Sequence, residues 1–147
     1  MKIAIAADHG GYEYKQKLIP HIEQLGHEIV DMGCYSAESV DYPDYVVPCA
    51  EAVASGSAKL GIVICGTGVG ASISANKVGK IRCALCTDPL MARLTREHNN
   101  ANILALGGRI IGIELAKEIV SVFLSTDFLG GRHQNRIDKI TQYEEGR

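Results

Sequence analysis

The residues best suited to chemistry follow a short apolar run at positions 60–65. Cys65 ends this run, and the glycine-rich segment Gly66-Thr67-Gly68-Val69-Gly70 comes directly after it. Glycines let backbone N–H groups approach a ligand closely, and a helix that begins here would direct its positive end at the same place. The segment is therefore expected to bind a negative oxygen and to stabilise a thiolate at Cys65. The segment alone is equally compatible with a buried strand end followed by a tight turn.

The same glycines have a second interpretation as a nucleotide-binding turn. Residues 66–71 match the fingerprint G-x-G-x-x-G/A, and Asp88 follows about 20 residues later, as dinucleotide-binding folds require. That fingerprint normally follows the first strand of a fold, whereas here it follows the third expected strand. A chain of 147 residues also leaves little room for a separate substrate domain. Nicotinamide binding is therefore the weaker alternative.

Other polar candidates lie next to expected strands and helices. Asp8 and His9 follow the first expected strand, His98 and Asn99 follow the fourth expected helix, and Arg109 follows the fifth strand. Polar groups at such junctions are where a sheet presents chemistry. Each also has an ordinary explanation as a turn residue or as a cap of a helix C-terminus.

Two arginines near the C-terminus suit an anion. Arg132 and Arg136 are four residues apart and would share one face of a terminal helix, whereas His133 would point elsewhere. Two guanidinium groups on one face can make paired hydrogen bonds to a phosphate, although a solvated basic face has the same pattern. His21 and His27 show no partner and are expected to lie on the surface.

The elements that must position these residues are short strands alternating with helices. We expect strands at 2–7, 28–31, 60–65, 82–86 and 103–106, and helices at 12–25, 45–55, from the glycine turn to 78, at 89–97, at 112–125 and at about 132–144. This order predicts one domain over residues 1–147 with a Rossmann-like, three-layer α/β/α architecture around a doubly wound five-stranded parallel sheet. Ligands bind such sheets beyond the carboxyl ends of the strands.

Composition excludes several other classes of protein. The formal net charge is −2, from 15 basic and 17 acidic residues, which argues against a nucleic-acid binder. The longest uncharged run, 60–76, contains glycines and polar residues and does not suit a membrane span. The five cysteines are an odd number in a chain with many aliphatic residues, so a secreted disulfide framework is not expected.

The cysteines and the N-terminus also indicate a compartment. Cys83 and Cys86 form a C-x-x-C without a second such pair, and the residues between them have the character of a strand, so we expect core residues rather than a redox or zinc motif. No metal site is expected. The N-terminus reaches Asp8 too early for a signal peptide. These features predict a reduced, cytoplasmic protein.

Six segments of the chain have a specific combined pattern, although each alone has low specificity. They are Asp8-His9-Gly10-Gly11, Asp41-Tyr42-Pro43, Cys65-Gly66-Thr67-Gly68-Val69-Gly70, Ala75-Asn76-Lys77, Arg96-Glu97-His98-Asn99, and Gly130-Gly131-Arg132-His133 with Arg136. Together, and in this order over nearly the whole chain, they resemble the type B ribose-5-phosphate isomerase family, which includes galactose-6-phosphate isomerase subunits.

The resemblance implies a cofactor-free aldose–ketose isomerase of the pentose phosphate pathway, converting ribose 5-phosphate into ribulose 5-phosphate. It also implies a homodimer, or a tetramer, whose sites are each built from two subunits. Cys65 is implied as the base that moves a proton between C1 and C2, and His98, helped by Asp8 and Tyr42, as the group that opens the furanose ring. The residues implied around the enediolate are Thr67, Asn99 and the amides of Gly66, Gly68 and Gly70; those implied at the phosphate are His9, Arg132 and Arg136, with Arg109 nearby.

The chemistry and the exact residues agree with these roles. An enediolate mechanism needs a base with a near-neutral pKa and donors aimed at the developing negative charge. One branch of the family replaces the cysteine by a glutamate just after the glycine turn, but this chain has Ala71 there. Cys34 and Cys83 replace Thr and Ala that are common in the family, and neither touches the implied roles. The alternatives are an isomerase of allose or galactose 6-phosphate, and a non-catalytic phosphate- or nucleotide-binding module.

Overall fold

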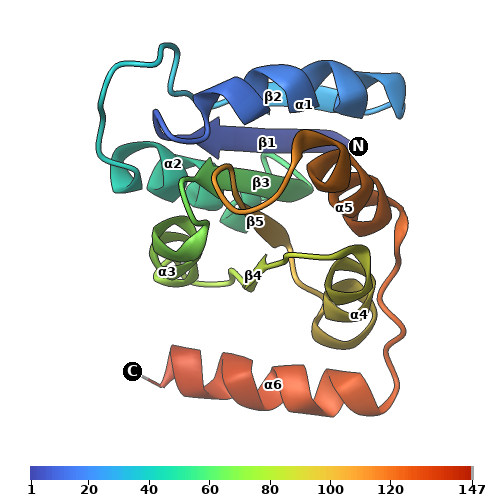
Figure 1. The fold of residues 1–147 in the computed structure, drawn as a ribbon. Coiled ribbons are helices and arrows are strands. Elements are labelled where there is room, and N and C mark those ends of the chain that lie inside the picture. The colour runs from blue at the N-terminus through green and yellow to red at the C-terminus, as the bar shows by residue number, and fades with distance from the viewer. Residues whose placement is uncertain (147) are drawn as a thin grey trace.

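The computed structural model describes residues 1–146 and contains a five-stranded parallel sheet with helices on both faces (Figure 1). The strand order is β2-β1-β3-β5-β4, and each neighbouring pair is parallel. This confirms the predicted three-layer fold. The strands are β1 (Lys2–Ala7), β2 (Glu28–Asp31), β3 (Leu60–Cys65), β4 (Cys83–Leu85) and β5 (Ile103–Gly107).

The helices follow the predicted order, with small differences at their ends. They are α1 (Tyr12–Gln24), α2 (Pro43–Ala54), α3 (Val69–Asn76), α4 (Pro89–Asn99), α5 (Ile113–Ser125) and α6 (Arg132–Glu145). Helix α2 begins at Pro43 rather than at Tyr45, because proline is favoured in the first turn of a helix. Helix α4 continues to Asn99, so His98 and Asn99 belong to its last turn instead of following it.

Alternate residues of the strands face two separate apolar layers. Ile3 and Ile5 of β1 pack with residues of α1, α4 and α5, whereas Ala4 and Ala6 pack with residues of α2 and α3. All six residues of β3 are buried. The absence of hydrophobic alternation in this strand therefore reflects a central position covered on both faces, as predicted.

Helix α6 lies apart from these layers, beyond the edge strand β4 (Figure 1). Its first turn lies near the end of α4, where the backbone N–H of Leu129 donates to Glu97 at 3.1 Å. Its last turns lie near the loop before β4, where Lys80 N donates to the Glu144 carboxylate at 2.9 Å. Within residues 1–146, no helix combines the length and the apolar character needed to cross a bilayer.

The strand order places a switch point between β1 and β3. The chain leaves β1 toward β2 on one side and leaves β3 toward β4 on the other, so the connections after β1 and β3 diverge at the carboxyl edge. Ligands of open α/β sheets bind at such a point. Asp8 follows β1, and Cys65 ends β3, so the two residues flank it.

Candidate active site

A cavity of about 430 Å³ opens at this switch point. It brings together residues from the ends of three strands and from the loop before α2. Its lining consists of Asp8, Tyr42, Cys65, Gly66, Thr67, Val69, Gly70, Ile73 and Arg109. Seven of the residues predicted from the sequence to form the site therefore line one cavity. Val69 and Ile73 were not predicted, although their i, i+4 spacing beside the glycine turn indicates that they share one face of α3.

Cys65 lies at the head of α3, where the glycine turn directs an amide at its sulfur. The backbone N–H of Gly68 donates to Cys65 Sγ at 3.1 Å, and the cysteine is only 5 % exposed. Gly68 has φ of +80°, and a Cβ there would lie 2.9 Å from the Leu106 carbonyl carbon. Only glycine fits this turn. The amide dipole and the positive end of α3 both favour negative charge on the sulfur.

Asp8 contributes a buried carboxylate to the same hollow. Its Oδ1 accepts hydrogen bonds from the backbone N–H groups of Gly10 at 2.8 Å and Gly11 at 3.2 Å. A Cβ on Gly11 would lie 2.5 Å from the Ile64 carbonyl oxygen, so this turn must pass close to β3. The close turn fixes the carboxylate between β1 and β3, with its second oxygen left for another partner.

Two side chains cover the glycine turn from either side. The Tyr42 ring lies over Gly70, and the Arg109 guanidinium lies over Gly66. A Cβ added to Gly66 would lie 3.2 Å from a guanidinium nitrogen of Arg109. Arg109 is fixed at its backbone, because its N–H donates to Gly66 O at 2.9 Å. A phenol and a cation thus face the same cavity as the cysteine.

His9 lies beside this cavity rather than in its lining. Its Nδ1 accepts a hydrogen bond from the backbone N–H of Val40 at 3.2 Å, which connects the turn after β1 to the loop that carries Tyr42. This contact fixes the tautomer, since Nδ1 must be unprotonated to accept. Nε2 then remains available as a donor.

Replacing Gly70 with alanine should damage the site without weakening the fold. The new Cβ would lie 2.6 Å from the Tyr42 ring, and this ring is 37 % exposed and can move away. Alanine favours the helix by about 1 kcal/mol over glycine, so the melting temperature should not fall. We expect kcat/KM for ribose 5-phosphate, the substrate that the resemblance implies, to fall about 10-fold, because a displaced phenol no longer contacts it. Gly79→Ala, where a Cβ meets no atom within 4 Å, is the control; equal kinetics in both variants would contradict a role for Tyr42.

The remaining predicted site residues form a second cluster at the opposite edge of the sheet. Helix α4 leaves the carboxyl end of β4 and returns the chain to the amino end of β5, so its last turn lies at the amino edge. His98 is on this turn, and its ring stacks on that of His133, with centroids 4.3 Å apart and planes at 16°. Arg132 and Arg136 share the first turns of α6 with His133. The chain therefore does not bring His98, Asn99, Arg132 or Arg136 to Cys65.

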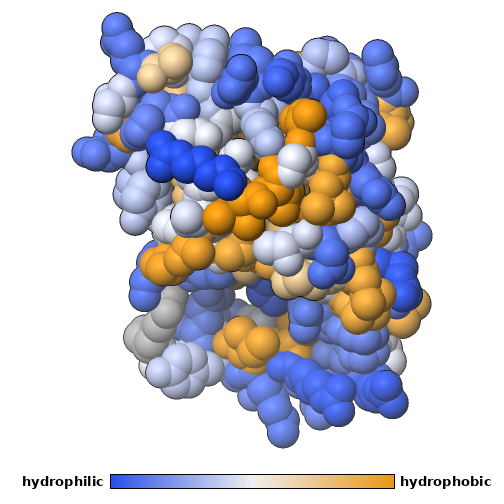
Figure 2. Space-filling model, viewed as in Figure 1, coloured by the Kyte–Doolittle hydropathy of each residue, from blue (hydrophilic) through white to orange (hydrophobic). Residues whose placement is uncertain are grey.

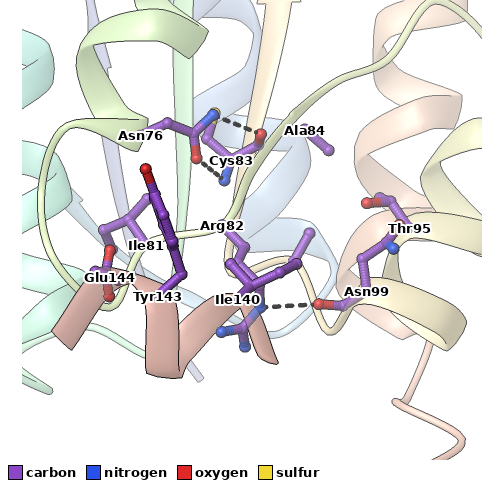
Figure 3. Close-up of a pocket in the computed structure, with 11 residues that line it drawn as sticks. Asn76, Ile81, Arg82, Cys83, Ala84, Thr95, Asn99, Ile140, Tyr143 and Glu144 are labelled. Atoms are coloured by element: carbon purple, nitrogen blue, oxygen red, sulfur yellow. Dashed lines mark hydrogen bonds between the residues drawn. The ribbon is translucent and has the colours of Figure 1, made fainter. Parts of the chain in front are cut away.

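A second cavity, of about 470 Å³, lies beside this cluster between α4, β4 and α6 (Figure 3). Asn99 and Thr95 line it from α4, and Ile140 and Tyr143 line it from α6. The Arg82 Nε donates to the carbonyl of Asn99 at 2.9 Å, which holds the end of α4 against the edge strand. Figure 2 shows apolar side chains on this side of the molecule, around a hollow between α6 and the sheet.

Three cysteines outside the switch-point cavity lie in surroundings that favour the neutral thiol. Burial raises the pKa of Cys49 and of Cys83 to about 12, and that of Cys86 to about 11, so all three remain thiols at neutral pH. The cysteines are all free, and no group of three or more metal-ligating side chains forms within residues 1–146. The expected core role of the C-x-x-C fits this environment.

One expectation from the sequence was wrong. His21 is not a partnerless surface residue, because its Nε2 lies 2.8 Å from Ser121 Oγ and 3.1 Å from the carbonyl of Lys117. It therefore connects α1 to α5. No local pattern predicts this contact, because α1 and α5 are far apart along the chain. His27 has a partner too, since its Nδ1 lies 3.2 Å from the terminal amine.

The protein is a doubly wound α/β protein with a candidate site at the switch point of its parallel sheet. There a thiol and a buried carboxylate lie beside an amide-lined turn that suits an oxyanion. Comparison with known proteins makes the assignment specific. The chain belongs to the Ribose/Galactose Isomerase family, whose model matches residues 3–140. The resemblance seen in the sequence is thereby confirmed.

Individual relatives agree with this assignment. The chain is 47 % identical over 146 residues to ribose-5-phosphate isomerase B of Escherichia coli, covering 99 % of this chain and 98 % of that protein. It matches the structure of Clostridium thermocellum ribose-5-phosphate isomerase B with a TM-score of 0.98, 53 % identity and 99 % coverage of both chains. It also matches the Mycoplasma genitalium enzyme with bound ribulose 5-phosphate, with a TM-score of 0.96 and 42 % identity over 99 % of this chain and 97 % of that one.

Proposed function

We propose that this chain is a type B ribose-5-phosphate isomerase, which interconverts ribose 5-phosphate and ribulose 5-phosphate through an enediolate. The observation that carries the proposal is the placement of the Cys65 sulfur, 3.1 Å from the Gly68 amide, in the switch-point cavity of a member of this family. The named relatives that it matches over nearly their whole length carry out this reaction by name.

In this mechanism, Cys65 acts as the base. Its thiolate removes the proton from C2 of the open-chain aldose, and the same proton returns to C1. The C1 aldehyde oxygen becomes a hydroxyl, and the C2 hydroxyl loses its proton and becomes the ketone. Between the two transfers the negative charge rests on the enediolate oxygens, for which Thr67 and the amides of Gly66, Gly68 and Gly70 are the nearby donors. No redox cofactor takes part, since the oxidation of C2 balances the reduction of C1.

Ring opening and phosphate binding use the second cluster together with residues at the Cys65 cavity. His98 delivers a proton to the ring oxygen as the furanose opens, assisted by Asp8 and Tyr42, while Asn99 adds a donor near the enediolate. Arg132 and Arg136, on one face of α6, bind the phosphate together with His9 and Arg109. Holding the phosphate far from the reacting carbons positions them without joining the chemistry.

These roles require a second copy of the chain, and we infer a homodimer with shared sites. The six residues of β3 span about 20 Å, and Cys65 lies at one edge of the sheet while His98 lies at the other. A five-carbon sugar phosphate is too short to reach both within one chain. Exposed apolar side chains flank both clusters: Val69 and Ile73 lie beside Cys65, and Ile140 and Tyr143 lie beside Asn99. Such surfaces suit the two halves of one interface.

Mixing two inactive variants tests the shared site. Cys65→Ala retains its His98 cluster, and His98→Asn retains its Cys65 cavity. When equal amounts are co-refolded, half of the dimers are mixed and each has one intact site, so activity per chain should return to about a quarter of that of the wild type. Each variant refolded alone is the control. If the mixture shows only the summed residual activities, each site lies within one chain.

The substrate is tested by a coupled assay for ribulose 5-phosphate formation, without added nucleotide or metal. We expect turnover of ribose 5-phosphate with a higher kcat/KM than that of allose 6-phosphate. Folded protein that turns over neither sugar would overturn the isomerase assignment, and a preference for allose 6-phosphate would assign the six-carbon substrate. Free thiols throughout the chain and a metabolic substrate support a location in the cytoplasm.

A further inference from the structure

The stacked pair of His98 and His133 has a feature that the proposed roles do not use. The two rings are nearly parallel, at 16°, with centroids 4.3 Å apart. His98 comes from the last turn of α4, and His133 comes from the first turn of α6. Because β5 and α5 separate the two helices along the chain, the stack is a tertiary contact. Among the described residues, the His133 side chain makes this stacking contact and no hydrogen bond.

Backbone contacts hold the two ends in register. The N–H of Leu129 donates to the carbonyl of Glu97 at 3.1 Å, directly beside His98 in the chain. The guanidinium of Arg96, which is 9 % exposed, donates through Nε to the carbonyl of Thr126 at 3.1 Å. The segment between α5 and α6 is therefore attached to α4 at two points. The stack is built on these attachments, and it is not a chance meeting of two free side chains.

The charges around the pair keep His133 neutral. Its pKa is lowered, first by desolvation and then by the positive charges of His98, Arg132 and Arg136, while Glu97 opposes the shift. Glu97 itself is paired with Arg93 at 3.0 Å, which weakens its influence. At neutral pH, His133 therefore presents an uncharged aromatic face to His98. A positively charged ring at this distance would disfavour a proton on His98.

We propose that His133 is the positioning residue for His98: its neutral ring fixes the plane of the His98 imidazole so that one nitrogen is aimed out of the cluster, toward the sugar ring oxygen. The proposal rests on the assignment of His98 to ring opening. Rotation about a single bond would turn the His98 imidazole away from this direction into another rotamer. A half-exposed histidine at the end of a helix has few other contacts that would favour one rotamer over the others. The stack supplies that choice, because it is the one ring contact His98 makes within residues 1–146.

The proposal distinguishes His133 from its neighbours Arg132 and Arg136. These arginines hold the phosphate in the ground state and in the transition state alike, so losing one should raise KM. Losing the stack should instead lower kcat with little change in KM, because the substrate still binds while His98 is misdirected. A general disturbance of α6 would move the arginines as well and would raise KM.

Three variants of the full-length enzyme test the proposal with ribose 5-phosphate. His133→Ala removes the stacking face, and kcat should fall about 10- to 100-fold with KM changed by less than about 3-fold. His133→Phe keeps a neutral stacking ring without a titratable nitrogen, and kcat should stay within about 3-fold of the wild type. Gln134→Ala, on the same turn but paired with Asp138 at 2.8 Å, is the control and should match the wild type.

Several results would overturn the proposal. If His133→Ala keeps the wild-type kcat, the stack does not position His98. If kcat is unchanged while KM rises, His133 is a phosphate ligand. If His133→Phe loses as much kcat as His133→Ala, a ring nitrogen acts directly and the role is catalytic. Failure of the isomerase assignment itself has a separate signature, since the wild type and Gln134→Ala would then both lack turnover.

Discussion

Replacing Cys65 with alanine should lower kcat for ribose 5-phosphate by about 10²- to 10⁴-fold, the contribution expected of a positioned base. The Cys65 sulfur accepts the Gly68 amide and lies 5 % exposed in the switch-point cavity, where no other thiol lines the wall. KM should change little, because the proposed phosphate ligands are untouched. Steady-state kinetics with a coupled ribulose 5-phosphate assay would measure both constants.

Cys83→Ala is the matched control for that loss. Cys83 lines the second cavity, where its backbone is hydrogen-bonded to the Asn76 side chain, and burial raises its pKa to about 12, so it cannot serve as a base at neutral pH. We expect its removal to leave kcat within about 3-fold of the wild type, as for a substitution that touches no reacting group. Near-normal turnover by Cys65→Ala would exclude the cysteine as the base. A loss in Cys83→Ala equal to that in Cys65→Ala would show that the effect is structural.

The sequence predicted the elements well wherever a local pattern determined them. The uniform apolar run at 60–65 became the buried central strand β3, and the glycine turn after it became the start of α3. The predicted start of α2 and the predicted end of α4 were less accurate. Pro43 is compatible with the first turn of a helix, and no residue before Asn100 ends α4. Asn100 adopts a left-handed conformation with φ of 44°, and asparagine is one of the few residues that do so readily.

The arrangement of the site was only partly readable. That Asp8 and Cys65 meet follows from parallel strands, whose carboxyl ends share one edge. The position of His98 at the amino edge of the sheet follows only when the full length of α4, which returns the chain to the start of β5, is known. The stacking of His98 on His133 was not predicted, because helix periodicity separates His133 from Arg132 and Arg136 but cannot show which residue contacts it. Tertiary contacts between distant helices leave no local pattern.

Removing the charge of Asp31 should destabilise the fold, because it breaks the ion pair with the buried Lys15. Lys15 of α1 is buried, with its side chain only 1 % exposed, and its ammonium contacts both carboxylate oxygens of Asp31 at 2.6 and 2.7 Å. The rings of Tyr12 and Tyr35 flank the ammonium at 5.7 and 5.4 Å. Breaking such a pair leaves a buried charge without its partner, which costs about 3–5 kcal/mol. Since Asp31 is itself 32 % exposed, we expect the lower end, about 3 kcal/mol, for Asp31→Asn.

The expected fall in melting temperature is about 6–12 °C, measured at one fixed protein concentration because the stability of the proposed dimer would depend on it. Two further variants identify the cause. Lys15→Met combined with Asp31→Asn removes the stranded charge and should recover most of the loss, since no charge then remains buried without its partner. Glu114→Gln breaks the exposed contact with Lys117 at 3.6 Å and should cost less than about 1 kcal/mol.

If Asp31→Asn costs no more than Glu114→Gln, water must reach Lys15 and the ammonium is not desolvated. If the double variant is as unstable as the single one, the loss comes instead from the Asp31 contact with the Gly33 amide at 3.0 Å, at the start of the loop that carries Tyr42.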